Sequence, residues 1–181
     1  MTQLVAQRKI KTWLLFFMLV GGGNTFAQQN DSVYVRVDSF PLNTGDLAFN
    51  AALDDPGFTV CNPKVVFQYY NTGSYYKQHK REIEHYFKNN YKPVFDLPGG
   101  NGYLTIRFII NCSGQTGRFR VYELNTRYQP ATFDPRITSQ LLKLTKELRG
   151  WQPAVYKDKI YDSYQYITFK LYKGGIECVL P

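Results

Sequence analysis

The two histidines are the residues best suited to acid-base or metal chemistry, and their spacing favours neither. His79 and His85 lie six residues apart in a segment that the sequence predicts to be helical. Metal-binding histidines on a helix share one face at a spacing of four residues, whereas a spacing of six places them on different sides. We therefore expect both histidines to be solvated, and we predict no metal site.

Serines and carboxylates also lack the arrangement that hydrolysis needs. The chain has no G-x-S-x-G motif, which would expose a serine nucleophile on a sharp strand-to-helix turn. Asp54-Asp55 and the Glu82/Glu84 pair are close only in sequence, and residues two apart on a helix do not face each other. We assign no catalytic residue, no enzymatic role and no cofactor, and an unrecognised hydrolase is the least favoured alternative.

The three cysteines are too widely spaced for a zinc-binding motif. In an oxidising compartment they could form one disulfide and leave one free thiol, and three pairings are open. We favour a bond between Cys61 and Cys112, which would tie the N-terminal segment to the first hairpin of the sheet. Cys178 would then be buried in the last strand.

The first 27 residues are typical of a cleavable signal peptide. Arg8, Lys9 and Lys11 precede an apolar run at 13–20, and small residues follow as far as Ala27. A membrane-spanning helix needs about 20 apolar residues, and this run is much shorter. We expect cleavage near Ala27, a periplasmic or secreted protein and no transmembrane segment in the mature chain. An uncleaved anchor is the alternative.

Size and charge indicate one small domain that does not bind nucleic acid. The whole chain has a formal net charge of +8, and removing residues 1–27 takes away three basic and no acidic residues, which leaves +5. Charges of both signs are interspersed and no run of five Lys or Arg occurs, so we expect no nucleic-acid partner. The remaining 154 residues fit one domain, for which about 100 to 200 residues is usual.

Before the domain, residues 28–63 are predicted to form an irregular extension, with one strand from Val33 to Asp38. The domain itself is predicted to span residues 64–181 and begins with a short β-prone run from Lys64 to Tyr70. An amphipathic helix follows from about Tyr75 to Asn90. It should end before Pro93, because a proline biases the residue before it away from helical angles.

The second half of the chain predicts a hairpin, a helix and two strands. Residues 103–111 and 119–124 form the hairpin, and four apolar side chains alternate onto one face of its first strand: Leu104, Ile106, Phe108 and Ile110. Asp134-Pro135 predicts the start of a second helix, and Gly150 predicts its end. Strands from Tyr164 to Leu171 and from Ile176 to Leu180 complete an α+β fold: a small antiparallel sheet of about three to four strands packed by two helices.

The order hairpin, helix, strand in residues 103–172 resembles the TonB carboxy-terminal domain family. In that family a strand and a glycine-containing turn, here Ile109 to Gly114, lead into a second strand and a helix. A W-x-P-A-like motif follows, here Trp151-Gln152-Pro153-Ala154, and then a final strand, here including Ile167-Thr168-Phe169. We expect structural roles in this motif: Trp151 closes the core between helix and sheet, and Pro153 prevents the helix from resuming.

The resemblance implies a protein-interaction module rather than an energy transducer. Transducers of that family are expected to keep an uncleaved anchor and a long proline-rich spacer, whereas this chain has a short leader and nine scattered prolines. A free-standing, exported relative would bind an extended segment of an envelope protein, an outer-membrane receptor among the candidates, by adding it to a sheet edge. Four residues of the edge strand would face the partner: Tyr164, Tyr166, Thr168 and Lys170.

Three questions stay open from the sequence. The terminal strand after Gly174-Gly175 could itself cover the predicted edge. The protein could be a monomer, or a homodimer that exchanges strands. A structural or assembly subunit of an envelope complex, without a discrete peptide site, is the alternative function.

Overall fold

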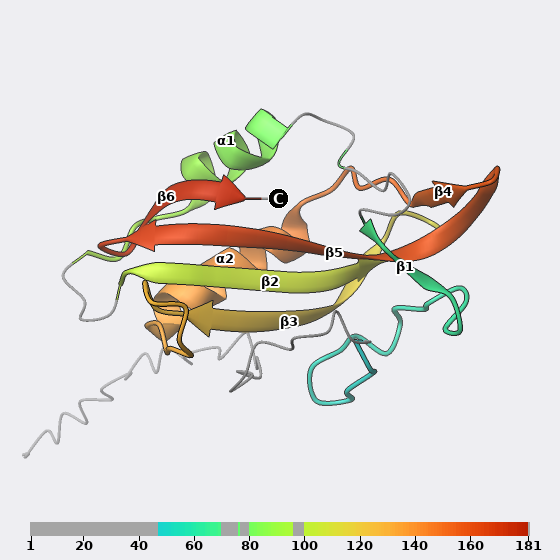
Figure 1. Cartoon of the computed structure of the whole chain (residues 1–181), viewed down its shortest axis with the longest axis horizontal. Helices are drawn as coiled ribbons and strands as arrows, with labels where there is room; N and C mark the ends of the chain where they lie inside the picture. The colour runs from blue at the N-terminus through green and yellow to red at the C-terminus, as the bar shows by residue number, and fades with distance from the viewer. Residues whose placement is uncertain (1–46, 70–75, 77–79, 96–99, 181) are drawn as a thin grey trace, which may run out of the picture.

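The computed structural model describes residues 47–69, 76, 80–95 and 100–180 (Figure 1). The predicted signal peptide and the predicted strand from Val33 to Asp38 lie outside these residues. The elements follow the order β1 (Val66–Gln68), α1 (Lys80–Asn90), β2 (Gly102–Ile110), β3 (Thr116–Leu124), α2 (Pro135–Glu147), β4 (Ala154–Tyr156), β5 (Lys159–Tyr172) and β6 (Gly175–Leu180). This is an α+β fold, as predicted. None of the described helices is long and apolar enough to span a membrane.

The sheet is larger than predicted and is not purely antiparallel. Among the described residues it has six strands, with the order β1-β5-β2-β3 and with β4 and β6 also paired to β5. β1 runs parallel to β5, and every other pair is antiparallel. The prediction of three to four strands was too small because β5 is 14 residues long and has room for four partner strands.

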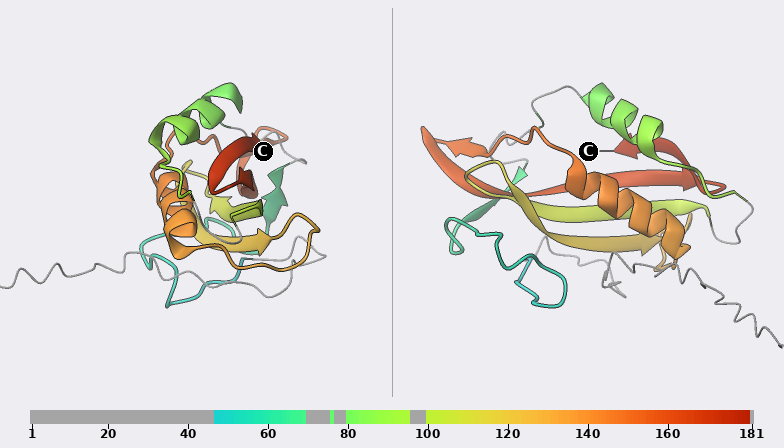
Figure 2. Two further views of the ribbon diagram at one scale, coloured as in Figure 1. Left: turned by 90° about the vertical axis from the view of Figure 1, so that its left-hand side faces the viewer. Right: turned by 180° about the vertical axis from the view of Figure 1, so that it is seen from behind.

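Both helices pack against the same face of the sheet (Figure 2). The alternating side chains of β2 that were predicted to share one face, Leu104, Ile106, Phe108 and Ile110, are fully buried in the core beneath them. α1 contributes Ile83 and Phe87, and α2 contributes Ile137 and Leu141. The apolar stripe of each helix therefore fixes which face of the sheet it covers.

α2 begins at its predicted position and both helices end close to theirs, whereas α1 begins at Lys80 rather than near Tyr75. Asp134 caps α2, since its carboxylate accepts a hydrogen bond from the backbone N–H of Arg136 at 2.8 Å, and Pro135 takes the first helical position. The helix ends at Glu147, where Leu148 adopts an extended backbone, so Gly150, with a φ of 107°, lies beyond the end of the helix. α1 ends at Asn90, before Pro93 as expected.

The described part of the extension, residues 47–63, contains turns and no helix or strand. It packs on the sheet through a second, smaller apolar cluster. Leu47 and Val60 of the extension meet Ile109 of β2 and Tyr164 of β5 there. Because Ile109 neighbours residues that belong to the main core, the second cluster lies on the opposite face of β2.

Candidate functional site

β5, the strand predicted to be the binding edge, lies inside the sheet. On one side β2 pairs with it, from Leu171 at one end to Ser163 at the other. On the other side β1 pairs with residues 162–164, and β6 pairs with residues 168–172. The prediction of an unpaired edge from Tyr164 to Leu171 is therefore wrong, because β1 and the terminal strand occupy its free side.

A short gap separates β1 from β6 along β5. Among the residues that the structure describes, no strand pairs with Gln165–Ile167 on this side. The backbone N–H of Tyr166 instead donates to the side-chain oxygen Oε1 of Gln165 at 2.8 Å. A gap of three residues, with its donor already satisfied, is too short for strand addition.

Two of the predicted binding residues, Tyr164 and Tyr166, make contacts within the chain. Tyr164 is buried in the second cluster, and the Arg107 guanidinium lies 5.9 Å from the centre of its ring. The hydroxyls of Tyr166 and Tyr69 are 3.0 Å apart, and their rings meet edge to face. Burial and this hydrogen bond raise the pKa of Tyr166 to about 12. Both tyrosines therefore stabilise this face of the sheet.

Thr168 and Lys170 also have partners on neighbouring strands. The hydroxyls of Thr168 and Thr105 lie 2.8 Å apart across β5 and β2. The Lys170 ammonium donates to Glu177 of β6 at 2.9 Å, and this hydrogen bond and the charge of Glu177 raise the pKa of Lys170. The four residues share one face of β5, as their alternation predicts, but not the edge of the sheet.

β6 is the outer strand on this side of the sheet. Among the described strands it pairs with β5 alone, and α1 packs beside it (Figure 1). Its register shifts between Lys170 and Leu171, so Glu177 is an extra residue without a partner in the β5 register. A bulge of this kind bends the strand and leaves one residue outside the ladder. The outer side of β6 has no partner strand among the described residues, and this makes it the candidate site for strand addition.

The opposite rim of the sheet, β3, is covered near both of its ends by the chain itself. Beyond β3 the chain turns back, and the N–H of Ala131 donates to the carbonyl of Glu123 at 3.0 Å. Near the start of β3, the guanidinium of Arg118 donates to the carbonyl of Leu47 in the extension at 3.0 Å. Of the two rims, β6 is thus the better candidate for strand addition.

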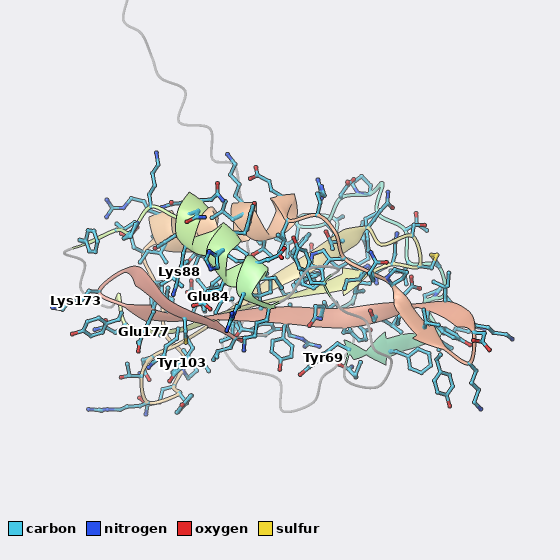
Figure 3. All side chains as sticks on the ribbon, turned by 90° about the horizontal axis from the view of Figure 1, so that it is seen from above. Tyr69, Glu84, Lys88, Tyr103, Lys173 and Glu177 are labelled. Atoms are coloured by element: carbon cyan, nitrogen blue, oxygen red, sulfur yellow. A yellow bond between two sulfur atoms is a disulfide. The ribbon has the colours of Figure 1, made fainter. Side chains whose placement is uncertain are left out.

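Charged side chains near β6 form pairs of opposite sign. Figure 3 looks down on this region and labels Glu84 and Lys88 on α1 and Glu177 on β6. The Lys88 ammonium lies 2.7 Å from the Glu84 carboxylate, and this interaction is the main reason why the pKa of Glu84 is lowered. Glu177 is in turn paired with Lys170, so these four side chains together carry no net charge.

The predicted disulfide between Cys61 and Cys112 is confirmed, and it joins the extension to the turn after β2. A fully buried carboxylate lies against it: Asp162 accepts hydrogen bonds from the backbone N–H groups of Asn62 at 2.8 Å and Cys112 at 2.9 Å. The two sulfurs and the carboxylate lie within 4.8 Å of one another, but the sulfurs are bonded and provide no thiolate for a metal ion. Cys178 is the free cysteine and is half-buried rather than buried.

Trp151 lies at the end of the main core, between the segment after α2 and the sheet. Its ring is 5.1 Å from that of Phe108 and 5.2 Å from that of Tyr76, centre to centre. Pro153 follows it where the chain runs toward β4. These positions fit the packing role that the sequence suggests for Trp151.

A cleft of about 340 Å³ lies beside Trp151, between the extension and the β2–β3 turn. Its charged lining residues are Asp55 and Arg149. The Asp55 carboxylate accepts from the N–H of Gly57, and the Arg149 guanidinium donates to the carbonyl of Lys146. Among the lining residues there is no nucleophile paired with a base, so the cleft does not suggest catalysis.

Comparisons with known proteins find no match. No family model matches the chain, and neither a curated protein nor a solved structure matches it. The strand order and the contacts described above are therefore the basis for a functional proposal.

Sequence patterns predict neither the presence of β4 nor the pairing of β1. β4 has only three residues, too few for a pattern of alternation. β1 lies within the β-prone run from Lys64 to Tyr70, but its parallel pairing joins residues almost one hundred positions apart. A turn sequence between two strands predicts that they pair as a hairpin. No local sequence feature predicts a parallel partner strand that is distant in the chain.

Proposed function

We propose that this protein is a non-catalytic, exported interaction module that binds an extended segment of an envelope protein along the outer edge of β6. The observation that carries this proposal is the position of β6 as the outer strand of a six-stranded sheet. A partner strand would gain main-chain hydrogen bonds along β6, and its alternate side chains would provide specificity. The proposed edge is thus one strand farther out than β5.

Two further features support this proposal. β2, β3, α2, the Trp151–Pro153 segment and β5 follow one another in the order of the TonB carboxy-terminal domain family, with β6 added outside them. The Cys61–Cys112 disulfide supports export, because disulfides persist mainly in oxidising compartments. We infer a free-standing relative of that family that serves a different partner from an energy transducer.

Hydrogen bonding, more than charge, would provide the affinity at this edge. Glu177 is paired with Lys170, and Glu84 is paired with Lys88, so the charges of these four side chains offset one another. Charge complementarity chiefly accelerates association and is screened by salt. Binding at β6 should therefore depend only weakly on ionic strength.

Proline at the bulge of β6 provides the test. Glu177→Pro removes one backbone N–H from an outer strand at the position that lies outside the β5 register, where proline is tolerated. Glu177→Ala removes the same side chain and its ion pair but keeps the N–H. In affinity capture of envelope proteins, we expect the wild type and Glu177→Ala to retain the same partner and Glu177→Pro to lose it.

Circular dichroism and thermal unfolding would establish that Glu177→Pro is folded. Capture of the same partner by both variants would contradict binding at the β6 edge. Loss of the partner in both variants would indicate recognition through the Glu177 side chain. A structural or assembly subunit without a peptide site predicts that no captured protein depends on this backbone donor.

A further inference from the structure

The β4–β5 hairpin lies at one end of the molecule (Figure 1), and several of its apolar side chains are exposed. Val155 and Ile160 face each other across the two strands and are 54% and 57% exposed. Tyr156, next to Val155, is also exposed. At the base of the same hairpin Ala154 is fully buried, so the exposure belongs to the tip.

Aromatic packing holds this tip in a fixed position. The ring of Phe67 in β1 lies 4.8 Å from that of Tyr161 and 5.6 Å from that of Tyr156, centre to centre. β1 also pairs with the residues of β5 that directly follow the tip. The exposed apolar residues therefore stand on a supported hairpin rather than on an isolated one.

The turn of this hairpin places a lysine at the tip despite an unfavourable backbone. Lys157 and Asp158 both have positive φ, 48° and 60°. Residues with a β-carbon disfavour this region, and Asn-Gly is the usual choice for two such positions. The Lys157 ammonium lies 5.3 Å from the centre of the Tyr156 ring. Strained turns of this kind are typical of functional surfaces.

Positive charge surrounds the apolar tip. Lys157 and Lys159 lie in the hairpin. Lys64 lies just before β1, which pairs with the residues of β5 that follow the hairpin tip. In these segments the acidic residues are Asp158 and Asp162, and Asp162 is buried with its carboxylate accepting backbone hydrogen bonds. Three exposed lysines thus face solvent beside one exposed carboxylate.

We infer that the β4–β5 tip docks on a membrane surface that contains anionic phospholipids. Val155, Tyr156 and Ile160 would enter the boundary between head groups and acyl chains, and Lys157 and Lys159 would lie among the phosphates. A lipid surface adapts to a convex tip and matches its positive charge.

Tryptophan reporters at the two ends of β5 provide the test. Ile160→Trp places an indole at the tip, and Tyr172→Trp places one at the far end of β5, at a side chain that is also 57% exposed. The spectrum of the wild-type protein, which contains Trp13 and Trp151, is subtracted from each. Emission is measured with vesicles of phosphatidylcholine alone and of phosphatidylcholine mixed with phosphatidylglycerol.

We expect a blue shift for Ile160→Trp with the anionic vesicles and none for Tyr172→Trp. Both variants carry the same N-terminal apolar run, so attachment through that run cannot produce the difference. Adding Lys157→Gln and Lys159→Gln should weaken partitioning about fivefold for each lysine. Val155→Trp is a second reporter if Ile160→Trp does not fold.

Three results would overturn the proposal. An equal shift at both ends would mean that the tip is not the docking site. The absence of a shift with anionic vesicles would mean that the tip does not enter lipid. A shift of Ile160→Trp with rising protein concentration and no vesicles would show that the tip binds a second copy of the chain.

Discussion

At the scale of single residues, a buried carboxylate joins the extension to the sheet. Arg120 of β3 donates to both carboxylate oxygens of Asp54, at 2.7 and 2.8 Å, and the N–H of Asn50 donates to one of them at 2.7 Å. Burial raises the pKa of Asp54, but these hydrogen bonds and the charges of Arg120 and Arg118 outweigh it. The pKa of Asp54 therefore lies below its usual value of 3.8.

This pairing predicts a pH-dependent stability. A carboxyl whose pKa is lower in the folded state stabilises the protein above the unfolded-state value of 3.8, and this contribution is lost as the pH falls below 3.8 through the folded-state pKa. Asp54→Asn should lower the free energy of unfolding by about 2 kcal/mol at neutral pH. The difference from wild type should shrink in strong acid. Urea unfolding over a pH series measures it.

Asp158→Asn is the matched control, because Asp158 lies in the exposed β4–β5 turn. It should change the free energy of unfolding by less than about 0.5 kcal/mol at any pH. A difference between wild type and Asp54→Asn that stays constant into acid would contradict the assigned pKa shift.

At the scale of elements, the disulfide and Asp162 join three segments that are distant in the sequence. The disulfide connects the extension to the turn after β2, across 51 residues. Asp162, near the start of β5, binds the backbone on both sides of that link, at Asn62 and at Cys112. The position of the extension is therefore fixed by one covalent bond and by a buried acceptor.

Removal of the disulfide should destabilise the protein substantially. In the chain-entropy account, a cross-link that closes a loop of about 50 residues contributes about 4 kcal/mol. In equilibrium unfolding by guanidinium chloride, we expect the free energy of unfolding of the Cys61→Ser/Cys112→Ser variant to be lower than that of the wild type by most of this amount. Cys178→Ser, which removes the half-buried free thiol, should lose far less. Equal losses in the two variants would contradict the role of the disulfide.

At the scale of the whole molecule, β5 connects the two proposed interaction surfaces. One end of β5 forms the exposed tip with β4, and the other end turns into β6 beside α1 (Figure 1). A protein docked on lipid through the tip would leave the outer edge of β6 accessible to a partner. Membrane docking and strand addition are therefore compatible.

The packing of the extension on the sheet should depend on one glycine. The ring of Phe58 occupies the position that a β-carbon on Gly117 of β3 would take. Gly117→Ala should therefore displace Phe58 and lower the free energy of unfolding by about 1 to 3 kcal/mol. Limited proteolysis should also cut the extension faster. Gly175→Ala, where the new carbon would meet only ordinary contacts, is the matched control.

A double variant separates this contact from a general effect of the alanine. In Phe58→Ala/Gly117→Ala the clash is absent. The double variant should therefore lose less free energy of unfolding than the sum of the losses in the two single variants. Simple additivity would show that Phe58 and Gly117 do not interact.

The sequence by itself determined the local features of this protein. Alternation along residues 104–110 correctly placed four side chains in the core, and Asp134-Pro135 correctly marked the start of α2. The disulfide partner of Cys61 was also predicted correctly. The core positions and the helix start depend on residue types and spacing within a short stretch of chain. The disulfide required only a choice among three possible pairings.

Only the tertiary structure decided which strand is outermost. Tyr164 to Leu171 has the pattern of a strand, but that pattern does not reveal that β1 and β6 cover its outer side. Main-chain hydrogen bonds between strands use groups that every residue except proline provides, so pairing over long distances leaves little trace in residue types. The strand order therefore places the proposed edge at β6 rather than at β5.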